Sequence, residues 1–325
     1  MNNYIIACDV GGTRIKVGII DSNGKLSHSE EVDSQAHLGT DALLESLKIL
    51  IKKRLPASIG EGNCLGIGLG LTGPVDSNLG VVLLPGKFNG LEGFPIVPLL
   101  REEFKLPVFA ENDGRLAAYA AKYCGNAKDV DWAVVITLGT GVGSGVIING
   151  DILVDPHFNF GIQIGHFTID ASNNNYCLTG NYGTGETLCS ATALVNQVKT
   201  AIQRGIPSSL SELYFEDPFK IGFKEIAEAC REKDVLCLRE LEIWKEHLAI
   251  LLINATHAYG PEKIILSGGA SLASDIFLED VQKKVNERVF KFPKNKGVPI
   301  EISSIQEYAG VYGAAAMLNK KLSEQ

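Results

Sequence analysis

The sequence has no CxxC cysteine pair, no basic tail and no low-complexity linker, and each absence excludes a class of protein. Its seven cysteines are odd in number and scattered, which indicates reduced thiols rather than a disulfide framework. The first residues hold neither a basic segment nor a long apolar run, so they do not resemble a secretory signal. From these absences we expect a cytoplasmic protein.

Positive charge is also scarce. Lys and Arg together number 30, Asp and Glu number 38, and the net charge is −8. A protein that binds nucleic acid through its phosphates needs a basic face, so no nucleic-acid partner is expected. Hydrophobic residues make up 45% and charged residues 21%, a balance typical of a soluble globular enzyme.

One uncharged stretch, residues 132–150, has nearly the length of a membrane span. It contains five glycines and three hydroxyl residues, which divide it into strand, turn and strand. We therefore expect a buried hairpin there and no membrane partner. Glycine is abundant throughout, at 35 of 325 residues against roughly 7% in average proteins, and this excess favours several tight backbone approaches.

The chain length of 325 residues predicts two domains, and a repeated pattern supports them. A short apolar strand at 4–8 is followed by the turn Asp9-Val-Gly11-Gly12-Thr13 and an alternating strand at 14–19. The pattern returns 128 residues later as a strand at 132–136, the turn Gly139-Thr140-Gly141 and a strand at 145–148. The strand and turn at 65–73 have a similar counterpart at 263–269. Duplication predicts two related α/β domains facing one another; two unrelated hairpins with similar turns are the alternative.

Helical spacing of apolar residues predicts the helices, and Pro56 is expected to stop the first of them. A polar segment at 208–219 is expected to be irregular. The expected helices are 41–55, 113–124, 191–204, 224–232, 235–259 and 310–322.

The turn after Asp9 has the chemistry of a phosphate site. Two glycines after a strand let backbone N–H groups approach a phosphate chain without an intervening side chain. The Asp9 carboxylate could hold Mg²⁺, usually through water, because Mg²⁺ dehydrates reluctantly. The alternative is a tight hairpin with a solvated aspartate.

Alternating glycines at 139–145 resemble a dinucleotide-binding fingerprint, but that fingerprint opens a helix and here a strand continues. No Gly-Lys-Ser/Thr follows, so a Walker A loop is also missing. A hairpin cradle is the better interpretation. Together with the turn after Asp9 and with Ser267-Gly268-Gly269, it would enclose a nucleotide from three sides.

Polar residues at two further places are candidates for catalysis or binding. Glu111-Asn112-Asp113 precedes a helix, where Asn and Asp are preferred N-caps, yet a carboxylate there could also accept a hydroxyl proton. His166 and Cys177 form a possible metal pair, but two ligands do not make a tetrahedral zinc site. Glu186 could simply be a favourable acid in the first turn of a helix.

The order of these motifs resembles the ROK family (repressors, uncharacterised reading frames and sugar kinases) of the actin-like ATPase superfamily. The resemblance covers nearly the whole chain. It rests on seven collinear motifs: Asp9 to Thr13, Gly66 to Asp76, Asn112-Asp113, Leu138 to Gly143, Ile164-Gly165-His166, Glu186 to Ser190, and Ser267 to Gly269 with the helix at 310–316.

The resemblance implies an α/β fold of two actin-like (ribonuclease H-like) ATPase domains with a cleft between them. The domains would be 1–111, with the helix at 310–325 packed near it, and 112–309. It implies a homodimeric sugar kinase that uses ATP and Mg²⁺. Family repressors carry an N-terminal helix-turn-helix, for which the hairpin at residue 9 leaves no room.

The resemblance also assigns roles to residues. Asp113 would be the catalytic base, and Asp9 would position Mg²⁺ through water. Sugar hydroxyls would be held by Asn112, Gln163, His166 and Glu186. The cofactor-binding residues would be Asp9, Gly11, Gly12, Thr13, Lys16, Gly139, Thr140, Gly141, Gly268 and Gly269.

The sequence departs from the family pattern at three places. The family's Gly-Glu-x-Gly-His has Gln163 in place of the glutamate, so the preference for hydroxyls can differ, because an amide both donates and accepts. The family's zinc pattern keeps Cys177 but has Thr179 and Thr184 in place of two cysteines, so no structural zinc is expected. Asn89 is a candidate for the missing asparagine of the Pro-Asn-x-x-Trp segment.

The function expected from these features is ATP-dependent phosphorylation of a hexose or hexose derivative, as in a glucokinase. Two alternatives remain open. The first is a non-catalytic sugar-binding or regulatory protein, and the second is a kinase that uses polyphosphate as the phosphate donor.

Overall fold

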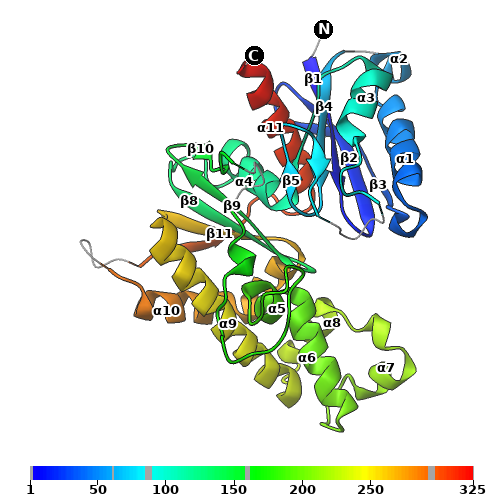
Figure 1. The fold of residues 1–325 in the computed structure, drawn as a ribbon. Coiled ribbons are helices and arrows are strands. Elements are labelled where there is room, and N and C mark those ends of the chain that lie inside the picture. The colour runs from blue at the N-terminus through cyan, green and yellow to red at the C-terminus, as the bar shows by residue number, and fades with distance from the viewer. Residues whose placement is uncertain (1–2, 61, 85–89, 158–161, 292–296, 325) are drawn as a thin grey trace. The chain divides into compact units, whose positions relative to one another are not determined.

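The structure is a computed structural model that describes residues 3–60, 62–84, 90–157, 162–291 and 297–324. The chain divides into two compact units (Figure 1). Unit 1 comprises Met1–Asp129, Gly150–Ile162 and Glu307–Gln325, and unit 2 comprises Val130–Asn149 and Gln163–Gln306. Within the described ranges, none of the helices is both long and apolar enough to span a bilayer.

Unit 1 is built on a five-stranded sheet with the order β3-β2-β1-β4-β7. The first three strands form an antiparallel meander, and β4 and β7 run parallel to β1. A small hairpin, β5 with β6, follows β4. The strands are β1 (Asn3–Val10), β2 (Arg14–Asp21), β3 (Leu26–Asp33), β4 (Asn63–Leu71), β5 (Val75–Asp76), β6 (Val81–Val82) and β7 (Val108–Asn112).

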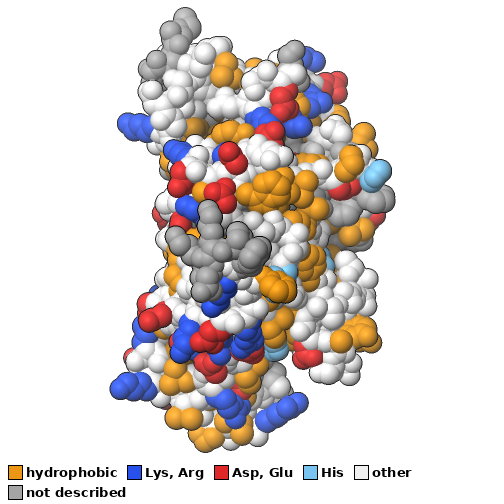
Figure 2. Space-filling model, turned by 90° about the vertical axis from the view of Figure 1, so that its left-hand side faces the viewer, with side chains coloured by type: hydrophobic (Ala, Val, Ile, Leu, Met, Phe, Trp, Pro, Cys, Tyr) orange, Lys and Arg blue, Asp and Glu red, His pale blue; other side chains and the backbone are white. Residues whose placement is uncertain are grey.

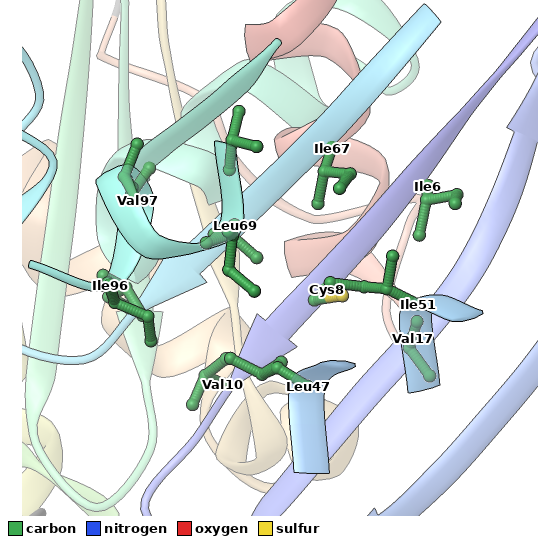
Figure 3. Packing of buried hydrophobic residues seen from close by; sticks show 14 of the residues in the cluster. Ile6, Cys8, Val10, Val17, Leu47, Ile51, Ile67, Leu69, Ile96 and Val97 are labelled. Carbon is green, nitrogen blue, oxygen red and sulfur yellow. The ribbon is translucent and has the colours of Figure 1, made fainter. Parts of the chain in front are cut away.

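The two faces of this sheet carry different residues because side chains alternate along a strand. On β4, Ile67 and Leu69 lie in the hydrophobic core, where they pack with β1 residues such as Ile6 and with the helix residue Leu47 (Figure 3). The glycines of β4 occupy the other face. A Cβ on Gly68 would collide with the backbone of the C-terminal helix, so this glycine permits the helix to approach the sheet closely.

That C-terminal helix, α11, packs on β1, on β4 and on α4, the helix that follows β7. At Gly313 a Cβ would meet the backbone of Leu116 in α4, so the two helices touch through their backbones. The helices of unit 1 are η1 (Ala36–Leu38), α1 (Thr40–Lys52), α2 (Pro56–Ile59), α3 (Ile96–Phe104), α4 (Asp113–Tyr123) and α11 (Ala309–Ser323).

The second sheet has the order β10-β9-β8-β11-β12, which matches the first sheet strand for strand. An antiparallel hairpin, β8 with β9, is again followed by two strands parallel to the first. The repeated turns of the sequence therefore correspond to a repeated strand order. The strands are β8 (Ala133–Leu138), β9 (Val142–Ile148), β10 (Asp151–Ile152), β11 (Lys263–Ser267) and β12 (Ile300–Ile302).

Helices make up most of the rest of unit 2. The longest, α9, ends where Gly260 adopts a left-handed conformation, φ 57°, that favours glycine. The helices are η2 (Ile164–His166), α5 (Gly185–Cys189), α6 (Ala191–Gln203), α7 (Ser211–Glu216), η3 (Pro218–Lys220), α8 (Phe223–Arg231), α9 (Val235–Tyr259), η4 (Gly269–Ile276) and α10 (Leu278–Arg288).

Three details differ from the sequence-based expectations. Pro56 begins α2 instead of only ending α1, because its missing N–H is not needed in a first helical turn. The segment expected to be irregular contains α7, which has no buried residue and so leaves no apolar periodicity to detect. The boundary expected after residue 111 differs from that of the units, because α4 packs against α11 and stays with unit 1.

Candidate functional site

In the turn between β1 and β2, the backbone carbonyl groups accept hydrogen bonds from other groups of the protein. Gly11 N–H donates to the carbonyl of Arg14 at 2.9 Å, and a Cβ on Gly11 would lie only 3.0 Å from that oxygen. Ser34 donates to the carbonyls of Gly12 and Thr13, both at 2.9 Å. Among the described residues, the N–H groups of Gly12 and Thr13 form no hydrogen bond. They are available to an anion.

Asp9 lies at the end of β1, in a crowded place made by two glycines. A Cβ on Gly70 would be 3.2 Å from its Oδ1, and a Cβ on Gly310, in the first turn of α11, would collide with its carboxylate. Burial, followed by the nearby charge of Asp113, raises the pKa of Asp9 to about 6, and Lys16 opposes this rise. Asp9 and Asp113 are therefore close enough to interact electrostatically within unit 1.

Lys16 lies opposite Asp9 in the β1–β2 pairing, and its ammonium group is engaged within unit 1. It donates to the carbonyl of Glu307 at 2.8 Å and lies 3.7 Å from the carboxylate of Glu31. The same group lies 5.4 Å from the ring centroid of Tyr308, within the range of a cation–π interaction. These contacts join β2 to the segment that enters α11.

Asn112 and Asp113 lie at the junction of β7 and α4. Asn112 is the N-cap of α4, and its Oδ1 accepts from Gly114 N at 2.9 Å and from Arg115 N at 3.2 Å. Its Nδ2 donates to the carbonyl of Gly73 at 2.8 Å and to Asp113 Oδ1 at 3.0 Å. The structural and functional interpretations of this motif are compatible, because the capping amide also orients the neighbouring carboxylate.

Beneath this junction lies a charged pair whose second member the sequence analysis missed. Glu111 and Arg115 form an ion pair in which each side chain is 1% exposed. Burial raises the pKa of Glu111 to about 7, although Arg115 opposes the rise. The spacing of four residues between an acid and a base is a signal for such a pair on a helix, but it does not distinguish a buried pair from an exposed one.

In unit 2, the turn between β8 and β9 is in contact with Glu186. A Cβ on Gly141 would collide with Glu186 Oε2, and the same oxygen accepts from Val142 N at 3.3 Å. Gly139 N–H donates to the carbonyl of Gly141 at 3.0 Å, whereas the N–H groups of Thr140 and Gly141 form no hydrogen bond among the described residues. This turn thus offers donors and also orients an acid from α5.

The predicted third glycine turn lies beside this hairpin. Gly268 has φ 86°, and a Cβ there would be 2.6 Å from the carbonyl oxygen of Leu138, the residue before Gly139. Gly269 begins η4, and a Cβ on it would meet no atom within 4 Å. Two of the three predicted nucleotide turns therefore adjoin one another in unit 2.

Gln163 is the N-cap of the short helix η2, and His166 is its last residue. Gly165 between them approaches β9 so closely that a Cβ would collide with the carbonyl of Val142. His166 is half-buried, and its Nδ1 is a buried atom with no hydrogen-bond partner among the described residues. The hydrogen bond of Ile164 N to Ser144 Oγ, at 3.0 Å, fixes the helix to β9.

The residues at the family's zinc positions do not fit a zinc site. Thr184 is fully buried, and its hydroxyl caps α5 by accepting from Thr187 N at 3.4 Å. Thr179 Oγ1 lies 3.1 Å from Cys177 Sγ. Neutral hydroxyl groups are not among the thiolate, imidazole and carboxylate ligands that bind zinc in proteins. The described residues contain no group of three or more potential metal-binding side chains of this kind.

The candidate Asn89 lies outside the described residues. Of the remaining candidates, Asp9, Lys16, Asn112 and Asp113 lie in unit 1, and Gln163, His166 and Glu186 lie in unit 2. On the face of the molecule in Figure 2, acidic and basic side chains are interleaved. Oxygen ligands suit Mg²⁺, so the carboxylates of Asp9 and Asp113 fit a divalent cation, whose charge would offset their mutual repulsion.

Comparisons with known proteins concern the chain as a whole. The model of the ROK family matches residues 5–321. A glucokinase of Halalkalibacterium halodurans is 28% identical over 322 residues, which cover 98% of this chain and 96% of the relative. A putative xylose repressor of Caldicellulosiruptor is 26% identical over 315 residues, which cover 97% of this chain and 77% of the repressor.

Among solved structures, a ROK family glucokinase from Streptomyces griseus, in complex with glucose and AMPPNP, has a TM-score of 0.84. It is 22% identical, and the match covers 98% of this chain and 99% of that one. At this identity the similarity concerns the fold, which is the expected mixed α/β fold of the actin-like ATPase type.

Proposed function

The chain belongs to the ROK family, and we propose that it is a sugar kinase that transfers phosphate from ATP to a hydroxyl group of a hexose or hexose derivative. The observation that carries the proposal is the junction of β7 and α4. There a carboxylate begins a helix, is held by a neighbouring amide and interacts with a second carboxylate at the end of β1.

Asp113 is the proposed general base. In phosphoryl transfer, an aspartate that accepts the proton of the attacking hydroxyl makes the oxygen a better nucleophile as it approaches the γ-phosphate in line. The amide of Asn112 and the N–H group of Gly114 both donate to Asp113 Oδ1, at 3.0 Å and 2.8 Å, which fixes the orientation of the carboxylate. Asn112 would act mainly by orienting Asp113, since both of its amide groups already contact the protein.

The free N–H groups of the two glycine turns are the proposed phosphate donors. Backbone amides bind phosphate oxygens without adding a side chain that must be ordered. Asp9 is proposed to hold Mg²⁺ through a water molecule bound to the cation. When bound, Mg²⁺ supplies positive charge that stabilises the phosphates during transfer.

In unit 2, Gln163, His166 and Glu186 are the proposed contacts to sugar hydroxyls. Gln163 supplies both a donor and an acceptor where a family carboxylate would only accept. Its neighbour His166 lies on the same short helix, which supports a joint role in choosing the sugar.

The decisive experiment is an ADP-release assay over hexoses, amino sugars and N-acetyl sugars, with ATP and polyphosphate compared as donors at a fixed sugar concentration. We expect ADP release with at least one sugar, and its loss in the variant Asp113→Asn. An unchanged rate in Asp113→Asn would refute the assignment of the base. Turnover with polyphosphate but not with ATP would show that polyphosphate is the phosphate donor.

A second function is a sugar-binding regulator without kinase activity. Two observations favour it: xylose repressors are among the relatives, and the N-cap of η2 is Gln163 in place of the family glutamate. Calorimetry separates the two functions. A sugar that binds with micromolar to millimolar affinity, while no sugar of the panel supports ADP release, would support the regulator.

A further inference from the structure

A buried ion pair lies directly behind the proposed base. We propose that Glu111 and Arg115 are positioning residues, which hold the carboxylate of Asp113 through Asn112. This inference rests on the proposed function, because it assigns to the pair a role in the same phosphoryl transfer.

The pair connects three segments of unit 1. Glu111 ends β7 next to Asn112, and Arg115 lies in the first turn of α4. The guanidinium group of Arg115 contacts Glu111 Oε1 and also donates to the carbonyl of Val75 in β5, at 3.1 Å. A helix, a strand end and the segment after β4 are thereby joined by one side chain.

A short path of hydrogen bonds runs from this pair to Asp113. Glu111 Oε1 accepts from Asn112 N at 2.7 Å, and Arg115 N donates to Asn112 Oδ1 at 3.2 Å. Asn112 Nδ2 in turn donates to Asp113 Oδ1 at 3.0 Å. Both the backbone and the side chain of Asn112 are fixed by members of the pair.

The same segment after β4 is held at two points. Asn112 Nδ2 donates to the carbonyl of Gly73 at 2.8 Å, and Arg115 donates to that of Val75, two residues further along. The two bonds together hold this segment against the β7–α4 junction. Loss of the Arg115 side chain would leave only the bond to Gly73, so the carbonyl that orients Asn112, and through it the carboxylate of Asp113, could shift.

Stability alone does not account for such a pair. Removing two charges from water is unfavourable, and buried ion pairs are often replaced by apolar residues with no loss of stability. Unit 1 contains a useful comparison in Arg54, which is 3% exposed and forms an ion pair with Glu30. Arg54 donates to the carbonyls of His28 and Leu50, remote in sequence from the β7–α4 junction.

The test compares Arg115→Met with the matched control Arg54→Met, because each variant removes a buried arginine from unit 1. We expect kcat to fall by about 10- to 100-fold in Arg115→Met, as a misplaced catalytic group would cause, while KM for the sugar changes little. In Arg54→Met we expect Tm to fall but kcat of the folded protein to stay within about twofold of normal. Equal losses of kcat in the two variants would overturn the proposal.

A second variant distinguishes a loss of catalysis from a loss of stability. Arg115→Met leaves the charge of Glu111 buried without its partner, whereas Glu111→Gln/Arg115→Met removes both charges and keeps an oxygen for Asn112 N–H. If the pair acts by positioning, the double variant should recover Tm but not kcat. Recovery of both would assign the pair a purely structural role.

A double-mutant cycle identifies the group through which the pair acts. Adding Arg115→Met to Asp113→Asn should change the remaining rate less than about twofold, because the base is already lost. The same fold-loss with and without Asp113 would refute the positioning role.

The ¹³Cγ chemical shift of Asp113 supplies a readout that needs no turnover. It should move in Arg115→Met and not in Arg54→Met. A wild-type protein without kinase activity would refute the proposed function, and this NMR comparison would still decide whether the pair positions Asp113.

Discussion

The two units have the same strand order but differ in the chemistry of corresponding positions. Two residues before the first glycine of each turn, unit 1 has Asp9 and unit 2 has Thr137. Asp9 interacts with a second carboxylate, whereas Thr137 Oγ1 only accepts from Gly143 N, at 3.2 Å, within its own hairpin. The parallel strand beside β4, β7, ends at Asn112 and is followed by Asp113. The corresponding strand β12 is followed by the neutral Ser303, which donates to the carbonyl of Ile305.

One strand order is therefore compatible with different chemistry at corresponding positions. Each sheet has a glycine turn after its first strand. Burial of a charge is unfavourable, as the raised pKa of Asp9 indicates. Unit 1 nevertheless has carboxylates at these strand ends, on the residues proposed as the base and as the holder of the cation. Unit 2 has neutral residues there and carries its polar side chains on η2 and α5.

The largest effect is expected from removing the carboxylate charge of Asp113, one of the groups that distinguish unit 1 from unit 2. Asp113→Asn should lower kcat by about 10²- to 10⁴-fold, the range of general base catalysis, and leave sugar binding measurable. Steady-state kinetics and calorimetry measure the two quantities. Asp41→Asn is the matched control, since Asp41 also lies in the first turn of a helix of unit 1 but is exposed. A similar loss of kcat in both variants would contradict the assignment.

A second prediction concerns the neutral turn of unit 2. In Gly141→Ala the new methyl group would collide with the end of the Glu186 side chain, which can move aside without unfolding the protein. We expect KM for the sugar to rise by about tenfold, which corresponds to about 1.4 kcal/mol of lost binding. Gly139→Ala is the comparison, because a methyl group there meets no atom within 4 Å. An equal rise of KM in both variants would show that Glu186 is not involved.

A third prediction concerns the effect of the buried Asp9 carboxylate on the free energy of unfolding. Burial and Asp113 raise the pKa of Asp9 from 3.8 to about 6, so the folded protein retains a proton that the unfolded chain releases between these values. Binding of this proton stabilises the folded state. The stabilisation is complete below pH 3.8 and is lost as the pH rises through 6. Asp9→Asn should therefore be more stable than wild type by about 3 kcal/mol at pH 8.

Urea denaturation followed by circular dichroism at several pH values measures this difference. The gain in stability of Asp9→Asn should shrink steadily as the pH is lowered towards 4. A gain that is independent of pH would mean that the charge of Asp9 is not its cause.

The smallest effect is expected from removing metal. Because Thr184 caps α5 and Thr179 contacts Cys177, a chelator such as EDTA should leave Tm within about 1 °C, in the absence of nucleotide. Metal analysis of the purified protein completes the test. One equivalent of zinc that resists dialysis, with a lower Tm after its removal, would contradict the expectation.

Local signals allowed much of the fold to be predicted. A short apolar run located β1, and alternation of apolar residues located β2. The 128-residue offset between glycine turns predicted a second sheet like the first. The capping preference of Asn112 placed the start of α4 correctly, because an N-cap acts on the next three residues of the chain.

Contacts between residues distant in the sequence could not be predicted in this way. Gly141 and Glu186 are 45 positions apart in the sequence. No local pattern indicates that the lack of a side chain at Gly141 leaves room for the carboxylate of Glu186. The burial of Arg115 depends on β5 and on the segment before it, so the sequence alone did not reveal its role. The raised pKa of Asp9 likewise depends on burial and on the charge of Asp113, which is distant from Asp9 in the sequence.

The position of α11 has a consequence for biosynthesis. Unit 1 is assembled from residues on both sides of unit 2, and α11 supports both β4 and the helix that begins with Asp113. A ribosome must therefore translate all of unit 2 before α11 can dock. During that interval α4, the helix that begins with Asp113, lacks the support of α11.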